Sequence, residues 1–198
     1  MAGGWRPVHD ERRGGRVGSL SVPPLVARAR ATARELGFEK SCRDEDGALL
    51  HVLAARRGIE RVGEIGTGTG VGTAWLASAL APGTLLYTAE LDATRAAAAM
   101  SLLTEDPDVH VLAGDWREVL PPHAPFDLIF VDGGHAKDDP DAVLRLATPG
   151  ATVVMDDFSA DWEGPDPRRE RWFAHPRVTV VELGTGANAR VIVAVVRR

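Results

Sequence analysis

The sequence predicts an α/β protein of the Rossmann-like, doubly wound type. We expect a seven-stranded, mostly parallel sheet with a C-terminal antiparallel hairpin and extra N-terminal helices. From Arg61 onward, short apolar segments alternate with helical segments, a pattern typical of strands joined by helices that cover both faces of a sheet. The last two apolar segments are joined by a short glycine-containing turn, which indicates a hairpin. Residues 21–198 are expected to form one domain, after a mobile arm at 1–20 that shows no hydrophobic periodicity.

The boundaries of the expected elements follow from glycine, proline and capping residues. Two helices precede the sheet: one starts at the proline pair 23–24 and ends before Gly37, and the other covers 44–57. The segment 126–131 (FDLIFV) is apolar at nearly every position, as expected for a strand covered on both faces. The expected strands are 61–65, 84–89, 109–113, 126–131, 151–155, 177–183 and 191–196, and the helices between them are 72–81, 93–103 and 139–147.

Composition excludes several classes of function. With 23 Lys and Arg against 28 Asp and Glu, the net charge is −5, which gives no electrostatic reason to expect a nucleic acid partner. No apolar run approaches the roughly 18 to 20 residues that cross a bilayer, and the first residues lack the apolar stretch of a secretory signal. The single cysteine, Cys42, cannot form an intramolecular disulfide. We therefore expect a cytoplasmic protein without membrane contacts.

A glycine-rich loop follows the first expected strand and is the strongest motif in the chain. It reads Glu64-Ile-Gly-Thr-Gly-Thr-Gly70, and Val71 stands where a dinucleotide-binding fingerprint needs its third glycine. No Gly-Lys-Ser/Thr closes the loop, so it is not a P-loop for nucleotide triphosphates. The loop instead fits an acid followed by G-x-G-x-G. This difference weakens the interpretation of the chain as a nicotinamide oxidoreductase.

Acidic residues also follow the next two expected strands. Glu90 ends the second strand, where its carboxylate could accept hydrogen bonds from both hydroxyls of a ribose. Gly114, Asp115 and Trp116 follow the third, where an acid could bind an adenine amino group and an indole could stack on the ring. Ligands of open α/β sheets bind beyond the carboxyl ends of the strands. The three strand ends together therefore indicate a nucleoside-containing cofactor.

Five segments in order, VGEIGTGTGVGTAWLASAL, LLYTAELD, VLAGDWREVLP, FDLIFVDGGH and GATVVMDDF, resemble class I S-adenosylmethionine-dependent O-methyltransferases. The resembling group includes catechol and caffeoyl-CoA methyltransferases. The resemblance covers 61–158, and a looser match extends it back to about Glu39. It implies S-adenosyl-L-methionine as cofactor, and it allows a homodimer. The cofactor contacts expected from it are Glu64, Gly66, Thr67, Gly68, Glu90, Leu91, Gly114, Asp115, Trp116 and Asp132. The backbone around Ser41 and Cys42 is expected to reach cofactor or substrate, with Cys42 as an inert thiol.

Three aspartates lie at the ends of the fourth and fifth expected strands: Asp132, Asp156 and Asp157. We expect these three acids to have no basic partner, so that they repel one another and a divalent cation would relieve the repulsion. Oxygen ligands suit Mg²⁺, or Mn²⁺ and Ca²⁺, better than zinc. The resemblance implies metal ligands here, usually Asp, Asp and Asn, so Asp157 adds one negative charge to the family pattern. The alternative is that Asp156 and Asp157 only cap a loop.

His135, three residues after Asp132, is the candidate general base. Catechol-type relatives are taken to use a lysine at that spacing, and the Asp132-Gly-Gly-His135 segment resembles the D-G-x-H of methyltransferases acting on sugars in natural products. An unperturbed histidine pKa of about 6.5 suits proton removal near neutral pH. Lys137 is a second candidate, less favoured because lysine is ordinarily protonated. Asp132 and His135 are thus the expected catalytic residues.

The sequence therefore predicts an O-methyltransferase that acts on a hydroxyl of a small-molecule acceptor, assisted by a divalent metal, best Mg²⁺, and a histidine base. Two alternatives remain: a metal-independent N- or other methyltransferase, and a cofactor-binding module without turnover. The acceptor side is less defined. Trp162 and Trp172 could form an aromatic wall for a planar acceptor, or could pack at the rim of the site.

Overall fold

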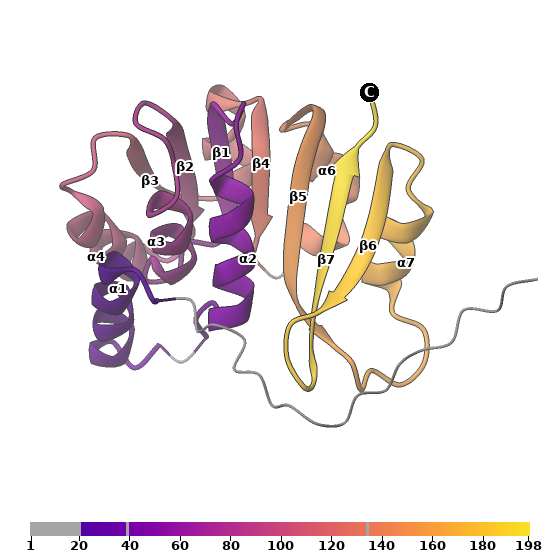
Figure 1. Cartoon of the computed structure of the whole chain (residues 1–198), viewed down its shortest axis with the longest axis horizontal. Helices are drawn as coiled ribbons and strands as arrows, with labels where there is room; N and C mark the ends of the chain where they lie inside the picture. The colour runs from indigo at the N-terminus through magenta and orange to yellow at the C-terminus, as the bar shows by residue number, and fades with distance from the viewer. Residues whose placement is uncertain (1–20, 39, 134) are drawn as a thin grey trace, which may run out of the picture.

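A seven-stranded sheet in the order β3-β2-β1-β4-β5-β7-β6 forms the centre of the computed structural model, which describes residues 21–38, 40–133 and 135–198. The arm expected at 1–20 lies outside the described residues. Strands β1 to β5 are parallel, and β7 runs antiparallel to both β5 and β6. The predicted sheet and hairpin are confirmed (Figure 1). The strands are β1 (Arg61–Ile65), β2 (Leu85–Glu90), β3 (Val109–Ala113), β4 (Phe126–Val131), β5 (Ala147–Ser159), β6 (Val178–Gly184) and β7 (Ala189–Val196).

Helices cover both faces of the sheet (Figure 1). One face is covered by α1 (Pro24–Glu35), α2 (Asp44–Ala54), α3 (Val71–Ala77) and α4 (Ala93–Leu103). The other is covered by α5 (Trp116–Val119), α6 (Pro140–Leu144) and α7 (Pro167–Ala174), with short 3₁₀ turns η1 (Pro121–His123) and η2 (Ala136–Asp138). No helix among the described residues combines the length and the apolar character that crossing a membrane requires.

Strand β4 contributes apolar side chains to the hydrophobic clusters on both faces of the sheet. Ile129 and Val131 lie in the apolar cluster under α5 to α7, whereas Leu128 and Phe130 lie in the cluster under α1 to α4. Successive side chains of a strand point to opposite faces, so a strand between two helical layers must be apolar at both sets of positions. The run FDLIFV therefore anchors the middle of the sheet.

Several helices are shorter than predicted. Helix α2 ends at Ala54 rather than 57. Helix α3 ends at Ala77 rather than 81, and the hydroxyl of the following Ser78 donates to the carbonyl of Ala74 (2.7 Å). Helix α6 ends at Leu144 rather than 147, because Ala147 already pairs with Phe126 of β4. Strand β5 is correspondingly longer than predicted, since it begins there.

Helix α7 was not predicted. It begins with Asp166, whose carboxylate accepts from the backbone amides of Arg168 and Arg169, followed by Pro167 at the first helical position. The Asp-Pro pair is the same start signal that correctly placed α6. The helix buries Trp172 in the core, so this indole is not an aromatic wall of an acceptor site. Trp162 is exposed.

Candidate active site

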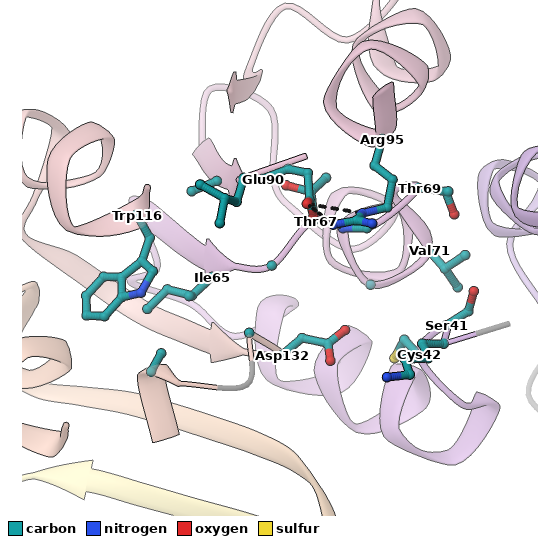
Figure 2. Close-up of a pocket in the computed structure, with 18 of the residues that line it drawn as sticks. Ser41, Cys42, Ile65, Thr67, Thr69, Val71, Glu90, Arg95, Trp116 and Asp132 are labelled. Carbon is teal, nitrogen blue, oxygen red and sulfur yellow. Dashed lines mark hydrogen bonds and ion pairs between the residues drawn. The ribbon is translucent and has the colours of Figure 1, made fainter. Parts of the chain in front are cut away.

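A cleft of about 860 Å³ lies beyond the carboxyl ends of β1, β2, β3 and β4 (Figure 2). Its walls come from the loop before α2, the glycine loop after β1, the ends of β2 and β3, and the loop after β4. Parallel strands end on the same side of the sheet, which is why residues far apart in the sequence meet here. The predicted site residues that line the cleft are Gly66, Thr67, Gly68, Glu90, Leu91, Gly114, Asp115, Trp116, Asp132, His135 and Asp157, and Ser41 and Cys42 line it too.

The glycine loop is held between β2 and β4. The amides of Gly66 and Thr67 both donate to the carbonyl of Ala89 (3.0 and 3.2 Å). Gly66 has φ +97°, and a β-carbon there would lie 2.8 Å from the backbone nitrogen of Gly133, so only glycine fits without displacing the loop. The loop can therefore bring its backbone close to a ligand in the cleft.

Glu90 is buried at the end of β2 and is nearly saturated by hydrogen bonds. Its Oε2 accepts from the amide of Gly68 (2.8 Å), and its Oε1 accepts from the amide of Asp92 (2.9 Å). Oε1 also accepts from the Arg95 guanidinium, at 2.7 Å from Nη2 and 3.1 Å from Nε (Figure 2). Arg95 itself lines the cleft, with its guanidinium 5.3 Å from the centre of the Phe38 ring. Neither Arg95 nor Phe38 was predicted from the sequence.

The end of β3 supplies an acid and an indole. The Asp115 carboxylate accepts from the amide of Arg117 (2.9 Å) and caps α5, so one of its oxygens is already engaged. The Arg117 guanidinium lies 4.6 Å from the centre of the Trp116 ring. Both Asp115 and Trp116 face the cleft, whose opposite wall begins at the glycine loop.

Glu64 lies behind the glycine loop and does not line the cleft. The side chain is fully buried, its Oε2 accepts from the hydroxyl of Thr73, and its Oε1 has no partner among the described residues. Burial raises the pKa of Glu64 to about 7, against hydrogen bonds from Thr73 and Thr88 that lower it. Direct contact between this carboxylate and a ligand in the cleft would require the loop to move.

The three predicted aspartates do come together. Asp132, Asp156 and Asp157 each offer an oxygen within 4.8 Å of the others, because Val131 of β4 pairs with Met155 of β5 immediately before them. Asp157 has φ +59° at a bulge in β5 and leaves 66% of its side chain exposed. Burial raises the pKa of Asp132 well above its usual value, and the nearby Asp156 raises it further. Burial also raises the pKa of Asp156, to about 6, against the opposing effect of Lys137.

The expectation that these acids have no basic partner is wrong. Lys137, in η2, donates from Nζ to Oδ1 of Asp156 (3.1 Å) and to the Asp156 carbonyl (2.8 Å), and Nζ lies 4.0 Å from Oδ2 of Asp157. Only 3% of the Lys137 side chain is exposed. The ammonium group is engaged in this buried ion pair, so Lys137 is not available as the second candidate for the general base.

His135 lies at the rim of the cleft with 95% of its side chain exposed. Its Nδ1 is 3.7 Å from Oδ2 of Asp138, three positions further along the chain. The exposed ring is accessible to an acceptor entering from solvent. Among the described residues, no buried group holds the ring in one orientation.

The loop before α2 and the first turn of α2 contribute Arg43 and Asp46, which the sequence did not single out, beside Cys42, which it did. Arg43 donates from Nε to Oδ2 of Asp46 (2.9 Å), and Asp46 is buried with its Oδ1 unpartnered among the described residues. Cys42 is buried, and burial together with Asp156 and Asp132 raises the pKa of its thiol well above the usual value. A thiol that stays protonated is a poor nucleophile, which agrees with the expected inert role.

Comparisons with known proteins identify the family. A family model described as a methyltransferase domain matches residues 64–158. A provisionally named O-methyltransferase of Mycobacteroides abscessus is 33% identical over 159 residues, covering 76% of this chain and 73% of the relative. The crystal structure of the O-methyltransferase TomG from Streptomyces achromogenes, in complex with S-adenosylmethionine, is 30% identical, with a TM-score of 0.74 over 89% of this chain and 91% of TomG. An O-methyltransferase from Bacillus cereus in complex with S-adenosylhomocysteine is 25% identical, with a TM-score of 0.75 over 88% and 91% of the two chains. The chain belongs to the class I S-adenosylmethionine-dependent O-methyltransferases.

Proposed function

We propose that this protein binds S-adenosylmethionine in the cleft beyond β1 to β4 and transfers its methyl group to a hydroxyl of a small-molecule acceptor. The observation that carries the proposal is the convergence of four strand ends on one cleft: the glycine loop, Glu90, Asp115 with Trp116, and Asp132. The bound cofactors of TomG and of the Bacillus cereus enzyme support it. The volume of about 860 Å³ leaves room for an acceptor beside the cofactor.

The cofactor would lie across the strand ends with its ribose at Glu90. Oε2 of Glu90 carries one hydrogen bond from the chain and can accept another, from a ribose hydroxyl. Oε1 carries three, so a second ribose hydroxyl reaches it only if Arg95 withdraws. Asp115 and Trp116 would receive the adenine, and the sulfonium end would lie over the glycine loop toward Asp132.

The acid cluster fits a divalent cation in the chemistry of its donors. Asp132, Asp156 and Asp157 offer oxygens within 4.8 Å of one another, and oxygen ligands suit Mg²⁺. When bound, such a cation would lower the pKa of an acceptor hydroxyl beside it. The chain itself would contribute the alignment of that hydroxyl with the sulfonium methyl group and the exclusion of water by the cleft walls. Asp132 and Asp157 line the cleft, so these two members of the cluster would lie beside the acceptor.

His135 is the proposed general base. It lies on the cleft rim, free to approach an acceptor, whereas the ammonium of Lys137 is buried against Asp156. Replacing His135 by Gln is expected to slow methyl transfer about 100-fold while leaving cofactor affinity nearly unchanged. An unchanged rate would remove the histidine from the mechanism.

Calorimetry with S-adenosylhomocysteine tests the cofactor site. The Glu90→Ala variant is expected to bind about 100-fold more weakly than the wild type, because it loses charge-assisted hydrogen bonds to the ribose. Glu105→Ala is the matched control, since Glu105 is an exposed glutamate that pairs with Arg28 at the surface, away from the cleft. Equal affinity in wild type and Glu90→Ala would refute the proposed ribose contact.

Metal dependence is tested by following S-adenosylhomocysteine production with a panel of hydroxylated acceptors. A chelator is expected to abolish turnover, and Mg²⁺ is expected to restore it. Full turnover in the chelator would favour the metal-independent alternative and remove the cation from the mechanism.

A homodimer is a separate proposal, and light scattering at micromolar concentrations decides between one and two copies.

A further inference from the structure

We infer that the ammonium group of Lys137 is a built-in cation of the acid cluster and that it weakens the affinity of the cluster for divalent cations. The inference rests on the proposed function, because it concerns the cation site of that proposal. Lys137 thereby has a role other than that of a candidate base, and removing its positive charge is expected to improve cation binding.

The geometry resembles that of a cation held by the cluster. Lys137 Nζ lies 2.8 Å from the Asp156 carbonyl oxygen, 3.1 Å from Asp156 Oδ1 and 4.0 Å from Asp157 Oδ2. The ammonium thus faces three oxygens of two neighbouring residues, and two of those oxygens belong to carboxylates of the cluster. The burial of both Lys137 and Asp156 limits screening of this interaction by solvent.

The charges around the cluster show what Lys137 changes. Four carboxylates face this region, those of Asp46, Asp132, Asp156 and Asp157, and two basic groups lie against them, Lys137 and Arg43. With these six groups ionised and the buried Glu64, which also interacts with Asp132, left protonated, the net charge is −2, which one divalent cation balances. Without the lysine, the sum is −3. A divalent cation would then meet one more unit of negative charge and would not be repelled by an ammonium a few ångströms away.

The backbone of Lys137 is held independently of its side chain. The buried indole of Trp172 donates from Nε1 to the Lys137 carbonyl (2.9 Å), and this contact ties α7 to η2. A substitution at position 137 therefore changes the charge beside the acids while the backbone keeps its main anchor. Lys137→Met preserves the length and bulk of the side chain without its charge, and Lys137→Arg preserves the charge.

The experiment is a calorimetric titration of the cofactor-free, full-length protein with Mn²⁺, which reads binding and not turnover. Lys137→Met is expected to bind Mn²⁺ at least about 10-fold more tightly than wild type, since at about 5 Å even a water-like dielectric gives a repulsion of that size. Lys137→Arg is expected to bind like wild type. The inference is overturned by equal or weaker binding to Lys137→Met, or by no binding to either protein. Added Asp156→Asn in the Lys137→Met background should abolish the gain.

Two further measurements keep the result interpretable. If Lys137→Met does not fold, Lys137→Gln provides the same loss of charge. Independently of both variants, wild type is expected to bind Mn²⁺ with a Kd of about 100 µM or weaker, as weak oxygen-ligand sites do. Low-micromolar binding by wild type would contradict the inference. Titration with S-adenosylhomocysteine reports on the cofactor site separately. A protein that fails to bind it while showing the Mn²⁺ difference would refute the proposed function and leave the role of Lys137 standing.

Discussion

The two ends of the cleft each hold an acid paired with a base of the same chain, and the two pairs differ in access to solvent. At the cofactor end, Glu90 is paired with Arg95, whose side chain is 35% exposed and lines the cleft. At the end proposed for the acceptor, Asp156 is paired with Lys137, whose side chain is 3% exposed, and neither residue is among those that line the cleft. An arginine at the surface can withdraw when a ligand arrives, whereas a sealed lysine cannot. We therefore expect the Glu90–Arg95 pair to separate when a ligand binds and the Asp156–Lys137 pair to stay formed.

The largest expected effect comes from breaking the sealed pair. Lys137→Met should lower the free energy of unfolding by about 3 kcal/mol in the absence of divalent cations, because it leaves a buried carboxylate without its partner. Chemical denaturation measures the loss. Lys137→Arg serves as the control and should lose much less. Equal stability of wild type and Lys137→Met would mean that the Lys137–Asp156 pair is not buried away from water in solution.

Glu64, a buried acid that has no basic partner in the described part of the chain, extends the comparison. Glu64 lies behind the glycine loop, and burial raises its pKa to about 7. A raised carboxyl pKa means that the folded state binds more protons than the unfolded state between about pH 4.5 and 7, so stability should fall as the pH rises through that window. Glu64→Gln removes the titrating group and should flatten this part of the stability profile by up to about 3 kcal/mol.

Denaturation at half-unit pH steps measures the difference between the Glu64→Gln and wild-type profiles. Glu60→Gln is a suitable control, since Glu60 is an exposed glutamate just before the start of β1, at the end of the strand opposite the cleft. Parallel profiles for wild type and Glu64→Gln would show that Glu64 keeps an ordinary affinity for protons.

The smallest expected effect concerns the exchangeable pair. Arg95→Met frees Oε1 of Glu90 for a ribose hydroxyl and should tighten S-adenosylhomocysteine binding about 3- to 10-fold, the value of one modest hydrogen bond. Calorimetry at two salt concentrations measures the affinity for S-adenosylhomocysteine, and the difference in affinity between Arg95→Met and wild type should become smaller at high salt. Weaker binding by Arg95→Met would indicate that Arg95 orients Glu90 for the ribose instead of competing with it.

The strand-end residues were predictable because they depend on regular elements. The run FDLIFV defined β4, and the glycine loop and Glu90 were located by their positions after β1 and β2. Parallel strands align their carboxyl ends, so position along the chain is enough to bring such residues together. The meeting of Asp132 with Asp156 was predicted for the same reason.

Residues in irregular turns were not predictable in this way. His135 and Lys137 are two positions apart, yet His135 is exposed and Lys137 is buried. The 3₁₀ turn η2 points their side chains in different directions, and Trp172 of α7 binds the Lys137 carbonyl. No periodicity in the sequence encodes that choice. Helix α7 carried an Asp-Pro start signal that could have been recognised, and doing so would have moved Trp172 from the acceptor side to the core. The Arg95 contact was not foreseen because its spacing of five from Glu90 follows no strand or helix repeat.

A crystal structure of the protein with S-adenosylhomocysteine tests the central claim most directly. The account predicts density for the nucleoside across the ends of β1, β2 and β3, with a ribose hydroxyl within hydrogen-bonding distance of Glu90 Oε2 and the adenine beside Trp116. Density for the ligand elsewhere, or a cleft filled by the protein's own side chains while the ligand is bound in solution, would contradict it.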